Sequence, residues 1–324
     1  MNKVYVTRQL PQKALDRLEG QVQYSVNPHD RVLERAELLQ AVAEVDGLLC
    51  LLTDTIDAEV FDAAPHLKIV ANYAVGYNNI DVEEATRRGI VVTNTPDVLT
   101  ETTADLTWAL ILSVARRVVE GDRFMRAGKY KGWAPMLLLG SDVFGKTLGI
   151  IGMGAIGQAV ARRAIGFDMT ILYSDIYVDL PPVAEQLLNA EEVSVEQVLR
   201  RSDFVSLHVP LVADTHHLIG REELAMMKPD AYLINASRGP VVDEAALVEA
   251  LRNGVIKGAG LDVYEDEPAM KPGLAELDNV VLLPHLGSAT IETRTAMADL
   301  AVDNLLAFFA GERPPTPVNP QVLG

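Results

Sequence analysis

The stretch TLGIIGMGAIG, from Thr147 to Gly157, is an apolar strand pattern that runs through a glycine-rich turn into a helix. Its glycines have the spacing G-x-G-x-x-G. The first glycine permits a tight turn, the second lets a pyrophosphate approach the backbone, and the third lets the helix pack closely on the strand. The start of the helix adds amide donors and partial positive charge. This context predicts a dinucleotide-binding turn formed by Gly152, Met153, Gly154, Ala155, Ile156 and Gly157.

A carboxylate follows this turn at the spacing expected for a ribose contact. The next strand-like segment ends in Asp175, eighteen residues after Gly157. A carboxylate there can accept both hydroxyls of the adenosine ribose and would repel a 2′-phosphate. No lysine or arginine lies between Arg163 and Arg200 to bind such a phosphate. The sequence therefore favours NAD(H) over NADP(H), although Asp175 would also suit an ordinary turn.

Strand-like and helix-like segments alternate on both sides of the turn, which is typical of parallel sheets. We expect an α/β protein with two Rossmann-like domains, each a parallel sheet flanked by helices. Residues 1–99 and 288–324 would form a discontinuous substrate-binding domain, and residues 100–287 the NAD-binding domain. Residues 102–127 are so apolar that they predict one long helix, buried on several sides. The strand-like segments are 3–7, 47–52, 67–74, 90–93, 147–153, 169–175, 204–209, 231–237, 258–263 and 280–284.

Composition narrows the class of protein. The chain has 324 residues, 49% hydrophobic and 23% charged, as expected for a globular protein of two domains. Its net charge of −17 argues against nucleic acid or an anionic membrane as a partner. No apolar stretch approaches the roughly 20 residues of a membrane span, and the amino terminus lacks a leader pattern. Cys50 is the only cysteine, so we expect a reducing cytoplasmic location. No cluster of histidines and cysteines has the spacing of a metal site, so we expect no metal.

Three polar motifs follow consecutive strand-like segments of the second domain. They are INASRG with Arg238, GLDVYEDEP with Glu267, and LPHLGS with His285. Ligands bind α/β sheets at the carboxyl ends of the strands, so these side chains should share one edge. Taken singly, Arg238 could cap a turn, Glu267 could belong to an acidic surface run and His285 could be a core histidine. Their joint occurrence after a dinucleotide turn predicts an active site.

With these motifs the chain resembles, over essentially its whole length, the D-isomer-specific 2-hydroxyacid dehydrogenases. The stretches NTPDVLT and GWAP, which begin at Asn94 and Gly132, make it most similar to the glyoxylate/hydroxypyruvate reductases. The resemblance implies hydride transfer between NAD(H) and a small 2-oxo acid, with glyoxylate giving glycolate and hydroxypyruvate giving D-glycerate, in a cleft between the domains. It implies that Arg238 pairs with the substrate carboxylate and carbonyl, that His285 is the general acid and base, and that Glu267 orients His285.

The resemblance also assigns binding residues. The backbone amides of Val75 and Gly76 match the loop that binds the substrate carboxylate, and Asp262 matches a residue that contacts the nicotinamide carboxamide. Trp133 matches a tryptophan that reaches into the neighbouring subunit's pocket, which implies a homodimer; packing at the domain border is the alternative. Further matches to the cofactor cleft are Thr103, Pro210, Thr215 and Ala236.

Departures from related families sharpen the expectation. Val75 stands where phosphite dehydrogenases carry a lysine, and no arginine follows Asp175 as in glyoxylate reductases that use NADPH. Two alternatives stay open: another small D-2-hydroxyacid dehydrogenase, or a binding protein like the C-terminal-binding corepressors, which share the fold and the Arg/Glu/His set. Of the other histidines, His208 is expected in the cleft wall, and His216 and His217 in a solvated loop.

Overall fold

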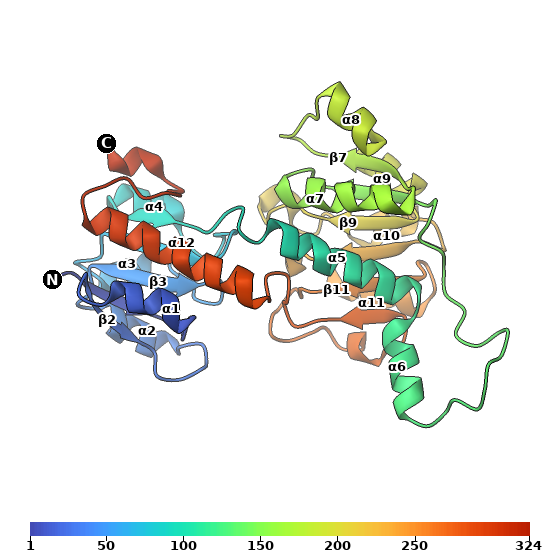
Figure 1. Cartoon of the computed structure of the whole chain (residues 1–324), viewed down its shortest axis with the longest axis horizontal. Helices are drawn as coiled ribbons and strands as arrows, with labels where there is room; N and C mark the ends of the chain where they lie inside the picture. The colour runs from blue at the N-terminus through green and yellow to red at the C-terminus, as the bar shows by residue number, and fades with distance from the viewer. The chain divides into compact units, whose positions relative to one another are not determined.

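The structure, a computed structural model, describes residues 1–324 and divides them into two compact units. Unit 1 comprises Met1–Leu99 and Ala289–Gly324, and unit 2 comprises Thr100–Ser288. Each unit is a parallel sheet flanked by helices (Figure 1). The predicted fold of two Rossmann-like α/β domains is thereby confirmed. No helix in the molecule has the length and apolar character needed to cross a membrane.

Unit 1 is built on five parallel strands, β1 (Lys3–Val6), β2 (Gln23–Val26), β3 (Gly47–Leu51), β4 (Ile69–Tyr73) and β5 (Val91–Thr93). Their order in the sheet is β2-β1-β3-β4-β5. Every residue of β4 is buried, as expected for a central parallel strand. Asp57, Asp81 and Thr290 cap three of the helices by accepting a backbone N–H. The helices are α1 (Gln12–Leu15), α2 (Arg35–Val42), α3 (Ala58–Ala63), α4 (Val82–Arg87) and α12 (Ile291–Phe309).

Unit 2 is built on seven parallel strands, β6 (Thr147–Ile151), β7 (Thr170–Ser174), β8 (Ala190–Glu192), β9 (Phe204–Leu207), β10 (Tyr232–Asn235), β11 (Gly258–Leu261) and β12 (Val280–Leu282). Their order is β12-β11-β10-β9-β6-β7-β8. From β6 the chain first adds β7 and β8 on one side, and then returns to add β9 on the other. This reversal beside β6 is the topological switch point at which α/β sheets bind ligands.

Helices cover both faces of this sheet (Figure 1). One face packs on α5 (Thr100–Ala115) and α7 (Ala155–Ala164), and apolar side chains such as Ile111 and Val160 are fully buried there. The other face packs on helices that contribute Leu199, Leu224 and Leu247 to a second cluster. The remaining helices of the unit are α6 (Val118–Arg126), α8 (Pro182–Leu188), α9 (Val195–Arg201), α10 (Arg221–Met226) and α11 (Glu244–Arg252).

The prediction of one long helix over residues 102–127 is wrong, because the chain breaks between α5 and α6. Arg117 is left-handed, with φ of 53°, which ends the α-helical path. The carbonyl of Ala115 accepts a hydrogen bond of 2.8 Å from the backbone N–H of Ser141, a residue far along the chain. α6 buries none of its residues, and in Figure 1 it and the long connection after it extend away from the sheet of unit 2.

Candidate active site

The glycine-rich turn has the backbone geometry that its sequence predicts. Gly152 has φ of +99°, and a Cβ there would lie 2.6 Å from the carbonyl carbon of His208. A Cβ on Gly157 would lie 2.1 Å from the carbonyl oxygen of Gly152, so both positions require glycine. A Cβ on Gly154, the N-cap of α7, would meet nothing within 4 Å. The start of α7 is therefore open to a phosphate group, and these residues fit a dinucleotide.

Asp175 follows β7 and is half-buried. One carboxylate oxygen accepts a hydrogen bond of 2.6 Å from the backbone N–H of Met153, in the glycine-rich turn. The other accepts hydrogen bonds from the backbone N–H groups of Tyr177, at 2.7 Å, and Val178, at 3.0 Å. Asp175 thus forms a local turn and also holds the glycine-rich turn in place. Its contact with a ribose stays a prediction.

Glu267 and His285 form a hydrogen-bonded pair in the loops after β11 and β12. The distance from His285 Nδ1 to Glu267 Oε2 is 3.0 Å. Burial by itself would raise the pKa of Glu267, but the hydrogen bond and charge of His285, with the Tyr264 amide and Arg238, hold that pKa below its usual range. An ionised carboxylate can only accept, so the proton lies on Nδ1 and Nε2 is left to face a reactant.

The corner that carries His285 is held by Asp262. His285 is left-handed, with φ of 55°, a conformation that costs energy in a residue other than glycine. Its backbone N–H donates to the carbonyl of Asp262 at 2.9 Å. The Asp262 carboxylate accepts from the backbone N–H groups of Leu286, at 2.6 Å, and Gly287, at 2.8 Å. Asp262 is 1% exposed, and burial raises its pKa. Bracing of this corner is a role that the motif did not reveal.

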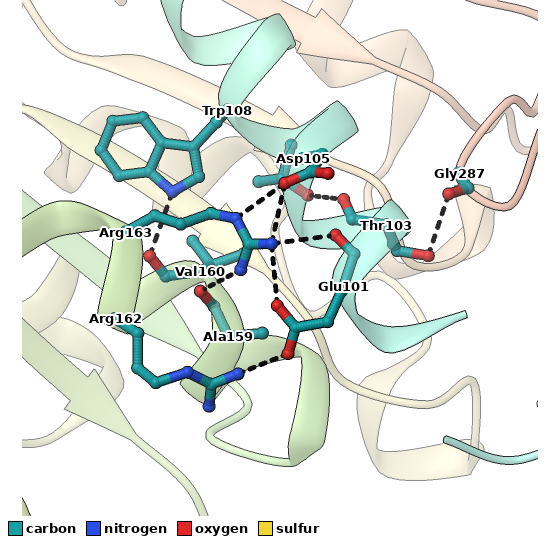
Figure 2. Close-up of polar contacts among 10 residues, drawn as sticks. Glu101, Thr103, Asp105, Trp108, Ala159, Val160, Arg162, Arg163 and Gly287 are labelled. Carbon is teal, nitrogen blue, oxygen red and sulfur yellow. Dashed lines mark hydrogen bonds and ion pairs between the residues drawn. The ribbon is translucent and has the colours of Figure 1, made fainter. Parts of the chain in front are cut away.

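Thr103 completes this brace from the first turn of α5. Its side chain is buried, and its hydroxyl donates to the carbonyl of Gly287 at 3.1 Å (Figure 2). α5 is itself tied to α7, because Arg163 pairs with Asp105 and Trp108 donates its indole N–H to the carbonyl of Val160. The helix of the glycine-rich turn and the His285 corner are therefore joined through α5. Direct contact of Thr103 with a cofactor stays a prediction.

Arg238 lies in the loop after β10, and its backbone is held by Asn235. The Asn235 amide donates to the Arg238 carbonyl at 3.0 Å, and its oxygen accepts from Ser237 N–H, also at 3.0 Å. A Cβ on Gly239 would lie 1.8 Å from the Tyr264 carbonyl oxygen, so this loop packs tightly against the loop that leads to Glu267. Burial lowers the pKa of Arg238, and the charge of Glu267 opposes that change. The guanidinium stays protonated at any working pH.

The loop after β4 in unit 1 exposes two free backbone donors. The N–H groups of Val75 and Gly76 donate to no acceptor in the protein. Their carbonyls are occupied: Asn94 donates to Val75 O at 2.8 Å, and Asn72 donates to Gly76 O at 2.9 Å. Successive free amides of this kind suit a carboxylate or another anion.

The remaining histidines differ in their surroundings. His208 Nε2 lies 2.8 Å from the Ser206 hydroxyl, and burial lowers the pKa of His208 to about 4, so the ring is neutral. It follows β9 beside the glycine-rich turn. His217 is paired rather than merely solvated, because its Nε2 lies 3.3 Å from Glu265 Oε1. His216 is exposed and stacks on His217.

Three further predicted cofactor residues lie in loops after strands of unit 2. Ala236 follows β10 and is half-buried. Pro210 is exposed after β9, and its carbonyl accepts a hydrogen bond of 2.6 Å from the Thr215 hydroxyl. These contacts shape the loop but do not test its role towards a cofactor. Trp133 lies after α6 and is 82% exposed; its reach into a partner subunit's pocket and the alternative, packing at a domain border, both stay predictions.

Comparison with known proteins places the chain among dehydrogenases. Residues 108–287 match the family model for the NAD-binding domain of D-isomer-specific 2-hydroxyacid dehydrogenases. A glyoxylate reductase of Thermococcus gammatolerans is 54% identical over 325 residues, covering 99% of this chain and 97% of the relative. A crystal structure of a glyoxylate reductase from Paecilomyes thermophila matches with a TM-score of 0.88 at 35% identity, covering 99% of both chains. That of the NADPH-dependent glyoxylate/hydroxypyruvate reductase of Sinorhizobium meliloti, with NADP and malonate, gives 0.87 at 37% identity, covering 98% of this chain and 96% of that one.

Proposed function

This chain belongs to the D-isomer-specific 2-hydroxyacid dehydrogenases, and from that premise we propose that it reduces glyoxylate to glycolate, and hydroxypyruvate to D-glycerate, with NADH. The observation that carries the proposal is the His285–Glu267 pair, at 3.0 Å, in the loops after β12 and β11, together with Arg238 in the loop after β10. β10, β11 and β12 are neighbours in the sheet, so the three side chains lie after neighbouring strand ends.

The residues divide the work of the reaction between them. The bound nicotinamide supplies the hydride. Arg238 pairs with the substrate carboxylate and polarises the carbonyl, and the free amides of Val75 and Gly76 provide further donors for the carboxylate. His285 delivers a proton from Nε2 to the carbonyl oxygen as negative charge develops there. Glu267, kept ionised, stabilises the positive imidazole before the transfer and fixes its orientation.

The test of this function is turnover with a substrate panel. Glyoxylate, hydroxypyruvate and pyruvate are each assayed with NADH and with NADPH, following cofactor absorbance. Oxidation of NADH by glyoxylate and hydroxypyruvate is expected. Binding of NADH without turnover of any 2-oxo acid would contradict the proposal and would favour a cofactor-sensing binding protein instead.

NADH preference is expected to depend on Asp175. Asp175→Ala should lower kcat/KM for NADH by about 10–100-fold, since hydrogen bonds to a charged group contribute roughly 1.5–3 kcal/mol, and should narrow its advantage over NADPH. Asp175→Asn is the matched variant, because its one remaining oxygen can still accept the Met153 N–H seen at 2.6 Å but carries no charge. It should keep the bond to the glycine-rich turn, lose those from the N–H groups of Tyr177 and Val178, and still admit NADPH. An unchanged NADH/NADPH ratio in both variants would refute the assignment.

A homodimer is part of the proposed function. α6 and the connection after it present large exposed apolar side chains, including Met125, Trp133, Met136, Leu139 and Phe144. Such patches on soluble proteins commonly mark association surfaces, and the proposed occupant is the same surface of a second copy, with Trp133 reaching its substrate pocket.

Sedimentation is expected to give twice the mass of one chain. Met136→Glu should weaken the dimer, because it places a charge on this surface. Leu187→Glu on α8 is the matched control, since the two positions are similarly exposed, 76% and 72%, and it should leave the mass unchanged. A monomeric wild-type protein, or equal behaviour of the two variants, would contradict the assignment.

A further inference from the structure

The loop after β4 is held by hydrogen bonds to successive backbone carbonyls. The carbonyl of Ala74 accepts from the backbone N–H of Thr95 at 2.9 Å. The carbonyl of Val75 accepts from the side chain of Asn94 at 2.8 Å. The carbonyl of Gly76 accepts from the side chain of Asn72 at 2.9 Å. Each of these acceptors belongs to a different peptide group, so three consecutive peptide planes are fixed.

Fixing these carbonyls also fixes the free N–H groups. A peptide group is planar and trans, so its N–H points opposite to its carbonyl. The Ala74 carbonyl shares a peptide with the Val75 N–H, and the Val75 carbonyl shares one with the Gly76 N–H. Thr95 and Asn94 therefore turn both free N–H groups away from the segment that holds them. Neither amide needs to reorganise when an anion arrives, which is how preorganised donors gain affinity.

Asn94 is itself anchored from the other end of unit 1. Its backbone N–H donates to the Thr316 carbonyl at 3.3 Å, and its carbonyl accepts from the Thr316 hydroxyl at 2.6 Å. Thr316 in turn is held by the fully buried Asn304 of α12, through bonds of 2.8 and 3.0 Å. The anchor thus runs from α12 through Thr316 and Asn94 to the loop after β4.

We propose that Asn94 is a positioning residue for substrate: by holding the Val75 carbonyl it aims the Gly76 N–H at the substrate carboxylate, with Asn72 holding the next peptide. This inference rests on the proposed function, since it assigns the anion at these amides to the 2-oxo acid. Asn94 touches no reacting atom in this role. Its loss should therefore lower the affinity for carboxylates but leave the rate of the chemical step and the affinity for NADH nearly unchanged.

The test compares Asn94→Leu with wild type. Leucine has a similar size but cannot donate to the Val75 carbonyl. The dissociation constant of oxamate, a carboxylate that cannot be reduced, is measured by calorimetry on the enzyme with saturating NADH, alongside steady-state kinetics with glyoxylate. The variant should raise both the oxamate Kd and the KM for glyoxylate about tenfold, as expected when one charge-assisted hydrogen bond is misaligned. The kcat should change less than threefold, and the KM for NADH should stay unchanged.

Asn27→Leu is the matched control. Asn27 is a buried asparagine in the loop after β2 of the same sheet, and like Asn94 its side chain donates to backbone carbonyls, those of Thr7 and Arg31 at 2.9 and 3.1 Å. It should lower the melting temperature but leave the oxamate Kd as in wild type. Should Asn94→Leu fail to fold, Asn94→Ala carries the same expectation, because position 94 is only half-buried.

The outcomes separate this inference from the proposed function. If wild-type protein neither binds oxamate nor reduces glyoxylate, both the proposed function and this inference are wrong. If wild type does both and Asn94→Leu binds oxamate equally well, the inference alone is overturned. A parallel loss of NADH and oxamate affinity in the variant, or the same loss in Asn27→Leu, would also overturn it, because both would indicate general disruption of the fold.

Discussion

Replacing His285 with alanine is expected to lower kcat for glyoxylate reduction by about 10²–10⁴-fold, the usual contribution of a positioned acid. The carbonyl oxygen must gain a proton as the hydride arrives, and Nε2 of His285 is the donor in the proposed reaction. The structure supports this role because Glu267 occupies Nδ1 at 3.0 Å and stays ionised, with its pKa held below the usual range. The KM for NADH should stay close to that of wild type. Single-turnover kinetics with saturating NADH would isolate the chemical step.

His217→Ala is the matched control for this variant. His217 also pairs with a glutamate, Glu265, at 3.3 Å, in the same unit. If a histidine–glutamate pair only stabilised the loops, the two variants would lose activity alike. We expect His217→Ala to keep kcat within a few-fold of wild type. Turnover of His285→Ala near the wild-type level would remove His285 from acid/base chemistry.

The fold could be predicted where local sequence and sheet position agree. The glycine-rich turn needs only its own strand and helix, and the central strands are nearly continuous apolar runs because both of their faces are buried. The edge strands β2 and β8 escape prediction, since neither QYSV nor AEE is a continuous apolar run like those of the central strands. The break at Arg117 could not be predicted for another reason. The apolar pattern continues through Val118 and Val119, and the hydrogen bond from the Ser141 N–H to the Ala115 carbonyl that accompanies the break comes from a distant segment.

The candidate site shows the same division. Arg238, Glu267 and His285 could be grouped from the sequence, because motifs that follow consecutive parallel strands share the edge where those strands end. The residues that hold these three in place could not be predicted from the sequence. Asn235 fixes the Arg238 loop and Asp262 fixes the His285 corner through backbone groups, and a sequence does not show which carbonyl or N–H a side chain reaches. A single polar residue in an otherwise apolar strand, such as Asn235 in YLIN, is the signal that could have pointed to it.

Arg238→Lys is expected to lower kcat/KM for glyoxylate by about 10²–10³-fold although it keeps the charge. Disrupting one partner of a buried charge pair costs roughly 2–5 kcal/mol, and a lysine cannot reproduce the planar fork that contacts two substrate oxygens at once. The side chain is half-buried, and burial lowers its pKa, so water replaces the missing donor poorly. The KM should rise and the kcat should fall, because in the proposed reaction the guanidinium binds the carboxylate and also polarises the carbonyl. Steady-state kinetics over a wide glyoxylate range would separate the two effects.

Arg221→Lys supplies the matched comparison, because Arg221 pairs with Glu249 on the surface of unit 2 and should tolerate lysine with no change in kinetics. The informative quantity is the difference between the two substitutions, which share the same chemistry and differ in burial and geometry. Full activity in Arg238→Lys would mean that only a positive charge is needed there, as a partner for Glu267. In that case the donors that recognise the substrate carboxylate would have to be sought chiefly in the free amides of Val75 and Gly76, whose orientation Asn94 and Thr95 fix.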